Sequence, residues 1–263
     1  MGHGRLLLYL AGLLPQAGVD TSLARMTARA ALAPLARNRR ALFVNRRRGL
    51  PAGSTMAALA AEHADAIRAL GRGPVDVLGV STGGSIAQQL AADHPDVVDR
   101  LVLVSTGCRL GVRARELQRR VARHVRAGEP HRALAIAALA MIADERIAAA
   151  VAPFFSPLAR GVGDLSDLAT TIEAEDGFDL AASAAPITAR TLIVAGDRAR
   201  FYGSALVAET AHLIPNSTVR LFRRRGNVTV TSDRRFAATV GERLPDGRPA
   251  AGVVTVRRFR PVE

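Results

Sequence analysis

The sequence predicts an α/β fold in which a mostly parallel sheet is flanked by helices, and two observations predict it. First, short apolar runs of strand length alternate along the chain with helical patterns of about 10–15 residues. Second, the apolar run Val75–Val80 leads directly into Ser81, within Gly79-Val80-Ser81-Thr82-Gly83, and apolar residues at helical spacing follow. A strand that turns at once into a helix, with glycines where the two backbones meet, is typical of the turn that presents a nucleophilic serine.

The composition fits one large domain and excludes several classes of protein. The chain has 263 residues, 49% of them apolar, which is enough for a well-buried core. Its net charge is +13, yet aromatic residues make up only 4% and no nucleic-acid-binding motif is present, so we expect no nucleic-acid partner. The single cysteine, Cys108, excludes an internal disulfide and is typical of a reducing compartment. Residues 6–14 could also pass for a signal-peptide core, but no clean cleavage site follows, and we expect a cytoplasmic protein. No apolar run approaches the roughly 20 residues of a membrane span, so we expect no membrane association.

The remaining elements follow from apolar periodicity and from the residues that begin or end helices. The expected strands are 6–10, 40–45, 75–80, 101–105, 187–194 and 219–222. The expected helices are 21–37, one capped by Ser54 that reaches Leu70, one that follows Ser81, 205–212 and 235–244. The tail at 253–256 is β-branched and could add an edge strand to the same or a neighbouring molecule, so a homodimer is one alternative.

Residues 109–176 depart from the alternation of strand and helix, and we expect them to form a helical lid. The segment 109–126 carries seven arginines and an apolar stripe at helical spacing, 133–142 is almost wholly apolar, and 153–157 is expected to be a break. The chain is thus divided into a core, 1–108 and 177–263, and a lid, 109–176. The inner surface of the lid would line an apolar pocket over Ser81. The expected pocket residues are Leu14, Met141, Phe154, Phe155, Phe201 and Tyr202.

Over nearly its whole length the chain resembles the α/β-hydrolase fold family, and most of all its small bacterial hydrolases that carry a lid after the sixth strand. The resemblance implies an eight-stranded, mostly parallel sheet and a serine–acid–histidine triad in that order along the chain. It also implies an oxyanion hole formed by the N–H of Thr82 and by an N–H near Leu13. On this alignment the first two of the usual eight strands are absent, which exposes one edge of the sheet.

Two of the three catalytic positions of that family are altered in this chain. The family's acid follows the seventh strand as Gly-x-x-Asp, and the matching residues are Gly196–Ala199, so Ala199 takes the place of the acid. The family's histidine follows the eighth strand as Gly-His, and the matching residues are Gly226 and Asn227. Because the nitrogen of an asparagine amide has no available lone pair, it cannot take the proton of Ser81.

These alterations leave four interpretations open. The favoured one is a non-hydrolytic enzyme that cyclises, isomerises or eliminates an apolar, carbonyl-containing small molecule, such as one of secondary metabolism, with Ser81 and Asn227 positioning the substrate or a proton. The second is an ester or thioester hydrolase with a relocated base, and the third is a catalytically silent binding protein. The fourth is an inactivated variant of an ordinary hydrolase. No cofactor or metal is expected, and the arginines of the lid are either solvated or bind an anionic partner such as an acyl-carrier protein. The candidate relocated bases are His124, His131 and His212.

Overall fold

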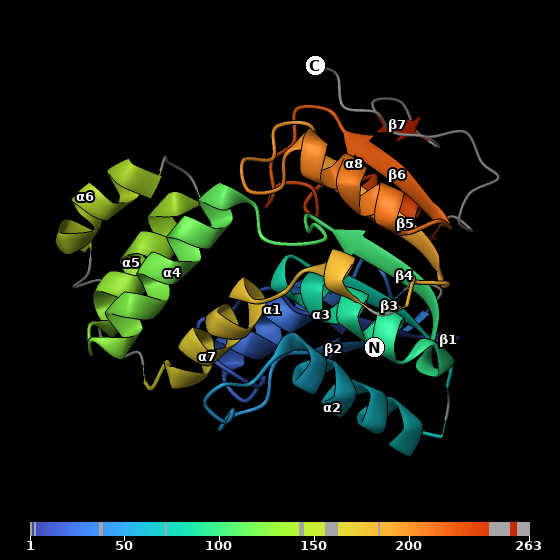
Figure 1. The fold of residues 1–263 in the computed structure, drawn as a ribbon, viewed down its shortest axis with the longest axis horizontal. Coiled ribbons are helices and arrows are strands. Elements are labelled where there is room, and N and C mark those ends of the chain that lie inside the picture. Colours follow the sequence, from blue (N-terminus) through green and yellow to red (C-terminus); the bar gives the residue numbers. More distant parts are fainter. Residues whose placement is uncertain are drawn as a thin grey trace.

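The described part of the chain forms one twisted sheet with helices on both faces (Figure 1). A computed structural model describes residues 2, 4–36, 39–71, 73–141, 145–155, 163–183, 185–241 and 253–256. Within these residues the strand order is β2-β1-β3-β4-β5-β6-β7, and only the β6–β7 pair is antiparallel. The strands are β1 (Arg5–Leu10), β2 (Arg39–Val44), β3 (Val75–Val80), β4 (Val98–Val104), β5 (Arg190–Gly196), β6 (Ser217–Phe222) and β7 (Val253–Val256).

The inner strands β3, β4 and β5 are buried on both faces, which is why they appear in the sequence as continuous apolar runs. In β1, Leu8 and Leu10 pack in one layer, and Leu7 and Tyr9 pack in the opposite one. The first layer contains α2 (Met56–Ala69), α3 (Thr82–Asp93) and α8 (Ser204–Leu213), and the second contains α1 (Ser22–Leu32) and α9 (Phe236–Gly241). Among the described residues, the short 3₁₀ helices are η1 (Pro95–Val97) and η3 (Leu180–Ala182).

Two expectations about the sheet are confirmed. Among the described residues the sheet ends at β2, and no strand corresponds to the first two of the usual eight. The tail strand β7 pairs with β6 of the same chain, with Val253 opposite Phe222. The homodimer stays a prediction.

Several predicted boundaries are wrong by a few residues. The helix expected over 21–37 ends at Leu32. Ala33 still has helical geometry, but Pro34 has no N–H with which to continue the hydrogen bonds of the helix. The cap of α2 is Thr55 rather than Ser54, since the Thr55 hydroxyl accepts the N–H of Ala58 at 3.1 Å. The strand expected from Ile187 pairs only from Arg190, although Ile187 is buried.

Within the described residues, four α-helices lie between β4 and β5. In Figure 1, α4, α5 and α6 form a group at one side of the molecule, and α7 lies between that group and the helices of the core. Their apolar faces pack into one cluster, which Leu13 and Phe201 of the core also contact. The break expected at 153–157 is wrong in its first part, because α6 continues through Pro153, which lacks only its own N–H. The lid and its limits stay a prediction, and residues 142–144 and 156–162 lie outside the described residues. The four helices are α4 (Val112–Arg126), α5 (Pro130–Ala140), α6 (Glu145–Phe155) and α7 (Ser166–Asp176).

None of the described helices is both long and apolar enough to span a membrane.

Candidate active site

Ser81 lies in a strained turn between β3 and α3. Its φ of 50° and ψ of −123° are a conformation that a non-glycine residue rarely adopts. The glycines on either side allow the close approach that this turn needs. A Cβ on Gly79 would lie 2.4 Å from the carbonyl oxygen of Gly83, and one on Gly83 would lie 2.3 Å from that of Leu10. The predicted reason for both glycines is therefore confirmed.

We expect Gly83→Ala to lower the free energy of unfolding by about 1–3 kcal/mol, because the new methyl group would force the backbone of β1 away from α3. Urea denaturation followed by circular dichroism measures the loss. Gly163→Ala is the control, since a Cβ at that position would meet nothing within 4 Å, and we expect a change within about 0.5 kcal/mol. Equal losses for the two variants would contradict the steric explanation.

The loop after β1 lies against the Ser81 turn, as the resemblance implies. A Cβ on Gly12 would be 3.4 Å from the Cβ of Ser81. The buried Arg46 holds the loop in place, because its Nη2 donates to the carbonyl oxygens of Leu14 at 2.6 Å and Pro15 at 2.9 Å. This loop is thus fixed by the end of β2 rather than by its own sequence.

The oxyanion donors expected at Leu13 and Thr82 stay predictions, and their surroundings are consistent with that role. Thr82 is the first residue of α3, where the helix dipole favours negative charge. In the described residues no acceptor is found for its N–H. Leu13 is half-buried and packs against the apolar cluster of α4–α7.

Asn227, which is predicted to take the place of the family's histidine, is bound to a neighbouring loop through its side chain. Its side-chain Oδ1 accepts the backbone N–H groups of Arg200 at 2.9 Å and Phe201 at 3.4 Å. Its backbone carbonyl oxygen accepts the Ser105 hydroxyl at 2.7 Å. Its Nδ2 is buried and has no hydrogen-bond partner among the described residues. The amide therefore fixes the loop that contains Ala199 and leaves an unpaired donor inside the protein.

Tyr202, predicted to line the pocket, is the partner of Ser81. The phenol is fully buried, and the Ser81 hydroxyl makes a hydrogen bond to it. Burial and the nearby Glu175 carboxyl raise the pKa of Tyr202 well above its ordinary value of 10, and the bond from Ser81 lowers it less. At neutral pH the phenol is uncharged, so it is a hydrogen-bond partner for Ser81 but not a base for its proton.

The sequence did not predict Glu175, which is the most perturbed carboxyl at this site. It is fully buried in the last turn of α7, and its two oxygens accept the hydroxyls of Ser85 and Thr82, each at 2.7 Å. Gln118 of α4 adds an N–H at 2.9 Å. Burial raises the pKa of Glu175 above its ordinary value, and these three hydrogen bonds offset only part of that effect.

Two of the expected pocket residues lie at the protein surface. Met141 exposes 47% of its surface and Phe154 exposes 82%, so the structure gives no support for either as a pocket residue. Phe201 packs against the α4–α7 cluster, and Leu14 is half-buried. The side chain of Phe155 lies outside the described residues.

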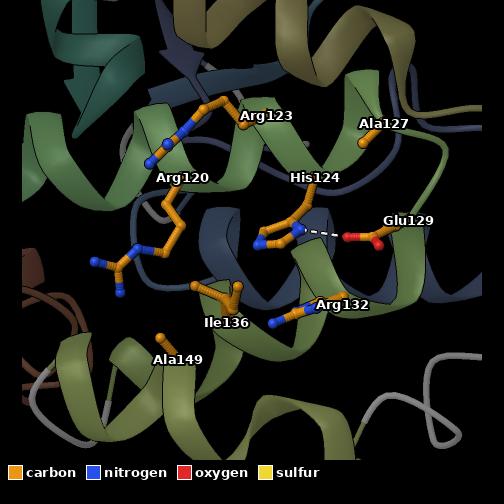
Figure 2. Close-up of a pocket in the computed structure, with 8 residues that line it drawn as sticks. All are labelled: Arg120, Arg123, His124, Ala127, Glu129, Arg132, Ile136 and Ala149. Carbon is orange, nitrogen blue, oxygen red and sulfur yellow. Dashed lines mark hydrogen bonds and ion pairs between the residues drawn. The ribbon is translucent and has the colours of Figure 1, made fainter.

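The histidines proposed as relocated bases are not found at Ser81. Among the described residues no imidazole hydrogen-bonds to Ser81, and Nδ1 of His124 binds the Glu129 carboxylate instead. A basic pocket within the helical segment has a volume of about 440 Å³. Figure 2 shows the pair of His124 and Glu129 in this pocket, together with Arg120 and Arg123. The described residues hold no cluster of side chains able to bind a metal ion.

Comparison with known proteins agrees with this geometry. A family model described as the alpha/beta hydrolase fold matches residues 25–129. An enol-lactonase from Burkholderia xenovorans LB400 is 22% identical, with a TM-score of 0.67 over 91% of each chain. An esterase from Exiguobacterium antarcticum is 17% identical, with a TM-score of 0.68 over 92% of each chain. A thermophilic esterase from Thermogutta terrifontis is 22% identical, with a TM-score of 0.67 over 91% of this chain and 89% of that one. No curated protein matches the sequence. The strand order, the Ser81 turn and these matches together lead to one conclusion: the chain has the α/β-hydrolase fold.

Proposed function

We propose that this chain is an α/β-hydrolase-fold enzyme that acts on the carbonyl group of an apolar small molecule without hydrolysing it. The observation that carries the proposal is the pairing of the Ser81 hydroxyl with the neutral phenol of Tyr202, where a hydrolase needs a base. Asn227 cannot substitute, because its only side-chain acceptor binds the backbone N–H groups of residues 200 and 201. In a serine hydrolase, removal of the base alone slows turnover by on the order of a million-fold.

The groups left at the site are suited to holding a carbonyl compound. The N–H of Thr82 and the unpaired Nδ2 of Asn227 are donors, and donors aimed at a carbonyl oxygen stabilise the negative charge that develops there. Cyclisation, isomerisation and elimination next to a carbonyl gain from such stabilisation without a nucleophile. The neighbours named above include an enol-lactonase and two esterases, which supports a carbonyl-bearing ligand.

Reaction with a fluorophosphonate probe tests the absence of an activated serine. We expect no labelling of Ser81 under conditions in which an ordinary serine esterase is labelled completely, because the probe reacts with a serine that a base has activated. We also expect wild type and Ser81→Ala to hydrolyse nitrophenyl butyrate at the same background rate. Peptide mass spectrometry locates any label.

Two outcomes would contradict the proposal. Complete labelling at Ser81, or ester turnover that Ser81→Ala abolishes, would show a hydrolase with a relocated base. The paired substitution Ala199→Asp with Asn227→His separates the remaining alternative. A large gain in ester hydrolysis would indicate an inactivated hydrolase. We expect little gain, because the Ser81 hydroxyl is already hydrogen-bonded to Tyr202.

A further inference from the structure

The proposed function leaves Glu175 unused, although it is the carboxyl most closely joined to the Ser81 turn. The Glu175 carboxyl accepts the hydroxyls of Thr82 and Ser85. Both residues belong to the first turn of α3. Thr82 contributes two groups: its hydroxyl binds Glu175, and its N–H is the expected contact for a substrate oxygen. The carboxyl therefore lies one side chain away from that contact.

A negative charge at Glu175 would compete with any anionic oxygen bound at Thr82. The N-terminus of a helix attracts one anion through its free N–H groups and its dipole. A second anion nearby meets the repulsion of the first. Two like charges about 6 Å apart, at the effective dielectric of a protein site, repel strongly enough to change an affinity by about a hundredfold. A neutral carboxyl has no such effect.

We infer that Glu175 decides which ligands the Ser81 site accepts: when its carboxyl is neutral the site takes an anionic oxygen, and when it is ionised the site takes only neutral carbonyl compounds. The inference rests on the proposed function in one respect, since it needs the Thr82 N–H as the contact for the ligand oxygen. It makes Glu175 a specificity-determining residue. Above the pKa of Glu175, the substrates would be ketones, esters or lactones rather than carboxylic acids.

The described groups that face Glu175 are all neutral. The ionisation of Glu175 itself therefore changes the charge of this site. From α3 it faces two hydroxyls, from α4 the neutral amide of Gln118, and from the loop after β5 the neutral Tyr202. The charged neighbours on α7 have partners of their own. Asp176 pairs with Arg115 and Arg119, and Glu173 pairs with Arg126. Because burial raises the pKa of Glu175, its ionisation moves from the ordinary acidic range toward neutrality.

Two matched probes, 4-fluorobenzoate and 4-fluorobenzamide, test the inference by fluorine NMR titration between about pH 5.5 and 8.5, where the first is always charged and the second always neutral. For wild type we expect the affinity for benzoate to fall by about a hundredfold as Glu175 ionises, and the affinity for benzamide to stay constant. For Glu175→Gln we expect both affinities to be independent of pH. Glu173→Gln, on the solvent side of the same helix, should behave as wild type.

A parallel fall of benzoate affinity in wild type and Glu175→Gln would overturn the inference, while constant benzamide binding would leave the proposed function standing. If benzamide binds neither protein, the carbonyl contact at Thr82 is wrong and both proposals fall. If Glu175→Gln does not fold, the titration of wild type with the two probes is still a sufficient test. An equal pH dependence of the two affinities would overturn the inference.

Discussion

Replacing Asp76 with alanine is expected to lower the free energy of unfolding by about 3–5 kcal/mol, because it removes a buried charge that joins three strands. Asp76 is 2% exposed at the start of β3, and its carboxylate pairs with Arg39 of β2 and, at 3.2 Å, with Arg5 of β1. These are the three strands at the open edge of the sheet. Without Asp76, the mostly buried guanidinium of Arg39 would lose its partner.

Asp65→Ala provides the matched control, since it also removes an aspartate bound to an arginine. Asp65 exposes 80% of its side chain, and its pair with Arg68 is 3.2 Å long on the surface of α2. Exposed pairs contribute little, so we expect a change within about 0.5 kcal/mol. Urea denaturation of both variants gives the comparison. Equal losses would mean that burial of Asp76 adds nothing.

The part of the site that is continuous in sequence could be predicted, because its causes are local. The strand, the serine and the helix lie within about twenty residues, and Gly79 prevents a clash with Gly83, which the same turn brings close. The neighbour of Gly83 is Leu10 of β1, which the turn alone does not place. The parallel direction of strands β1 to β6 also follows from the alternation of strand and helix. The absence of a base at Asn227 stays a prediction, since it depends on the residue type and on the resemblance alone.

Glu175 could not be found in this way, because 93 residues separate it from Thr82. Two other acids, Glu173 and Asp176, lie within two positions of it, and composition does not show which of the three is buried. The available signal was helical phase. Glu175 follows Leu168 and Ile172 at the spacing i, i+4, i+7, which places it on the apolar face of α7.

Tyr202 and Phe154 show the same limit for aromatic side chains. Both were expected to line the pocket because an apolar pocket needs aromatic residues. Tyr202 meets Ser81 because the Asn227 amide holds the loop before it, a contact between residues far apart in the chain. Phe154 lies on the outer side of α6, and its hydrophobicity alone did not indicate which face of the helix would be covered.

Glu175→Gln is expected to become progressively more stable than wild type as the pH rises. Because burial raises the pKa of Glu175 in the folded state above 4.5, the folded chain holds this proton more tightly than the unfolded chain. The stability that the proton provides is complete below the unfolded pKa and is lost as the pH rises through the folded pKa. Each pH unit between the two values removes about 1.4 kcal/mol from wild type, and glutamine has no proton to lose.

Denaturation at a series of pH values measures this difference in the free energy of unfolding. The way in which the difference changes with pH is the test. The difference should grow from about the ordinary carboxyl pKa upward and level off above the folded pKa of Glu175, at the pH where benzoate affinity reaches its lower value. Glu173→Gln, which removes only an exposed pair with Arg126, should give a flat difference. A flat or falling difference for Glu175→Gln would instead mean that the three donors keep the carboxylate ionised. The N-terminus of α3 would then carry a permanent negative charge, and the site would reject anionic ligands at every pH.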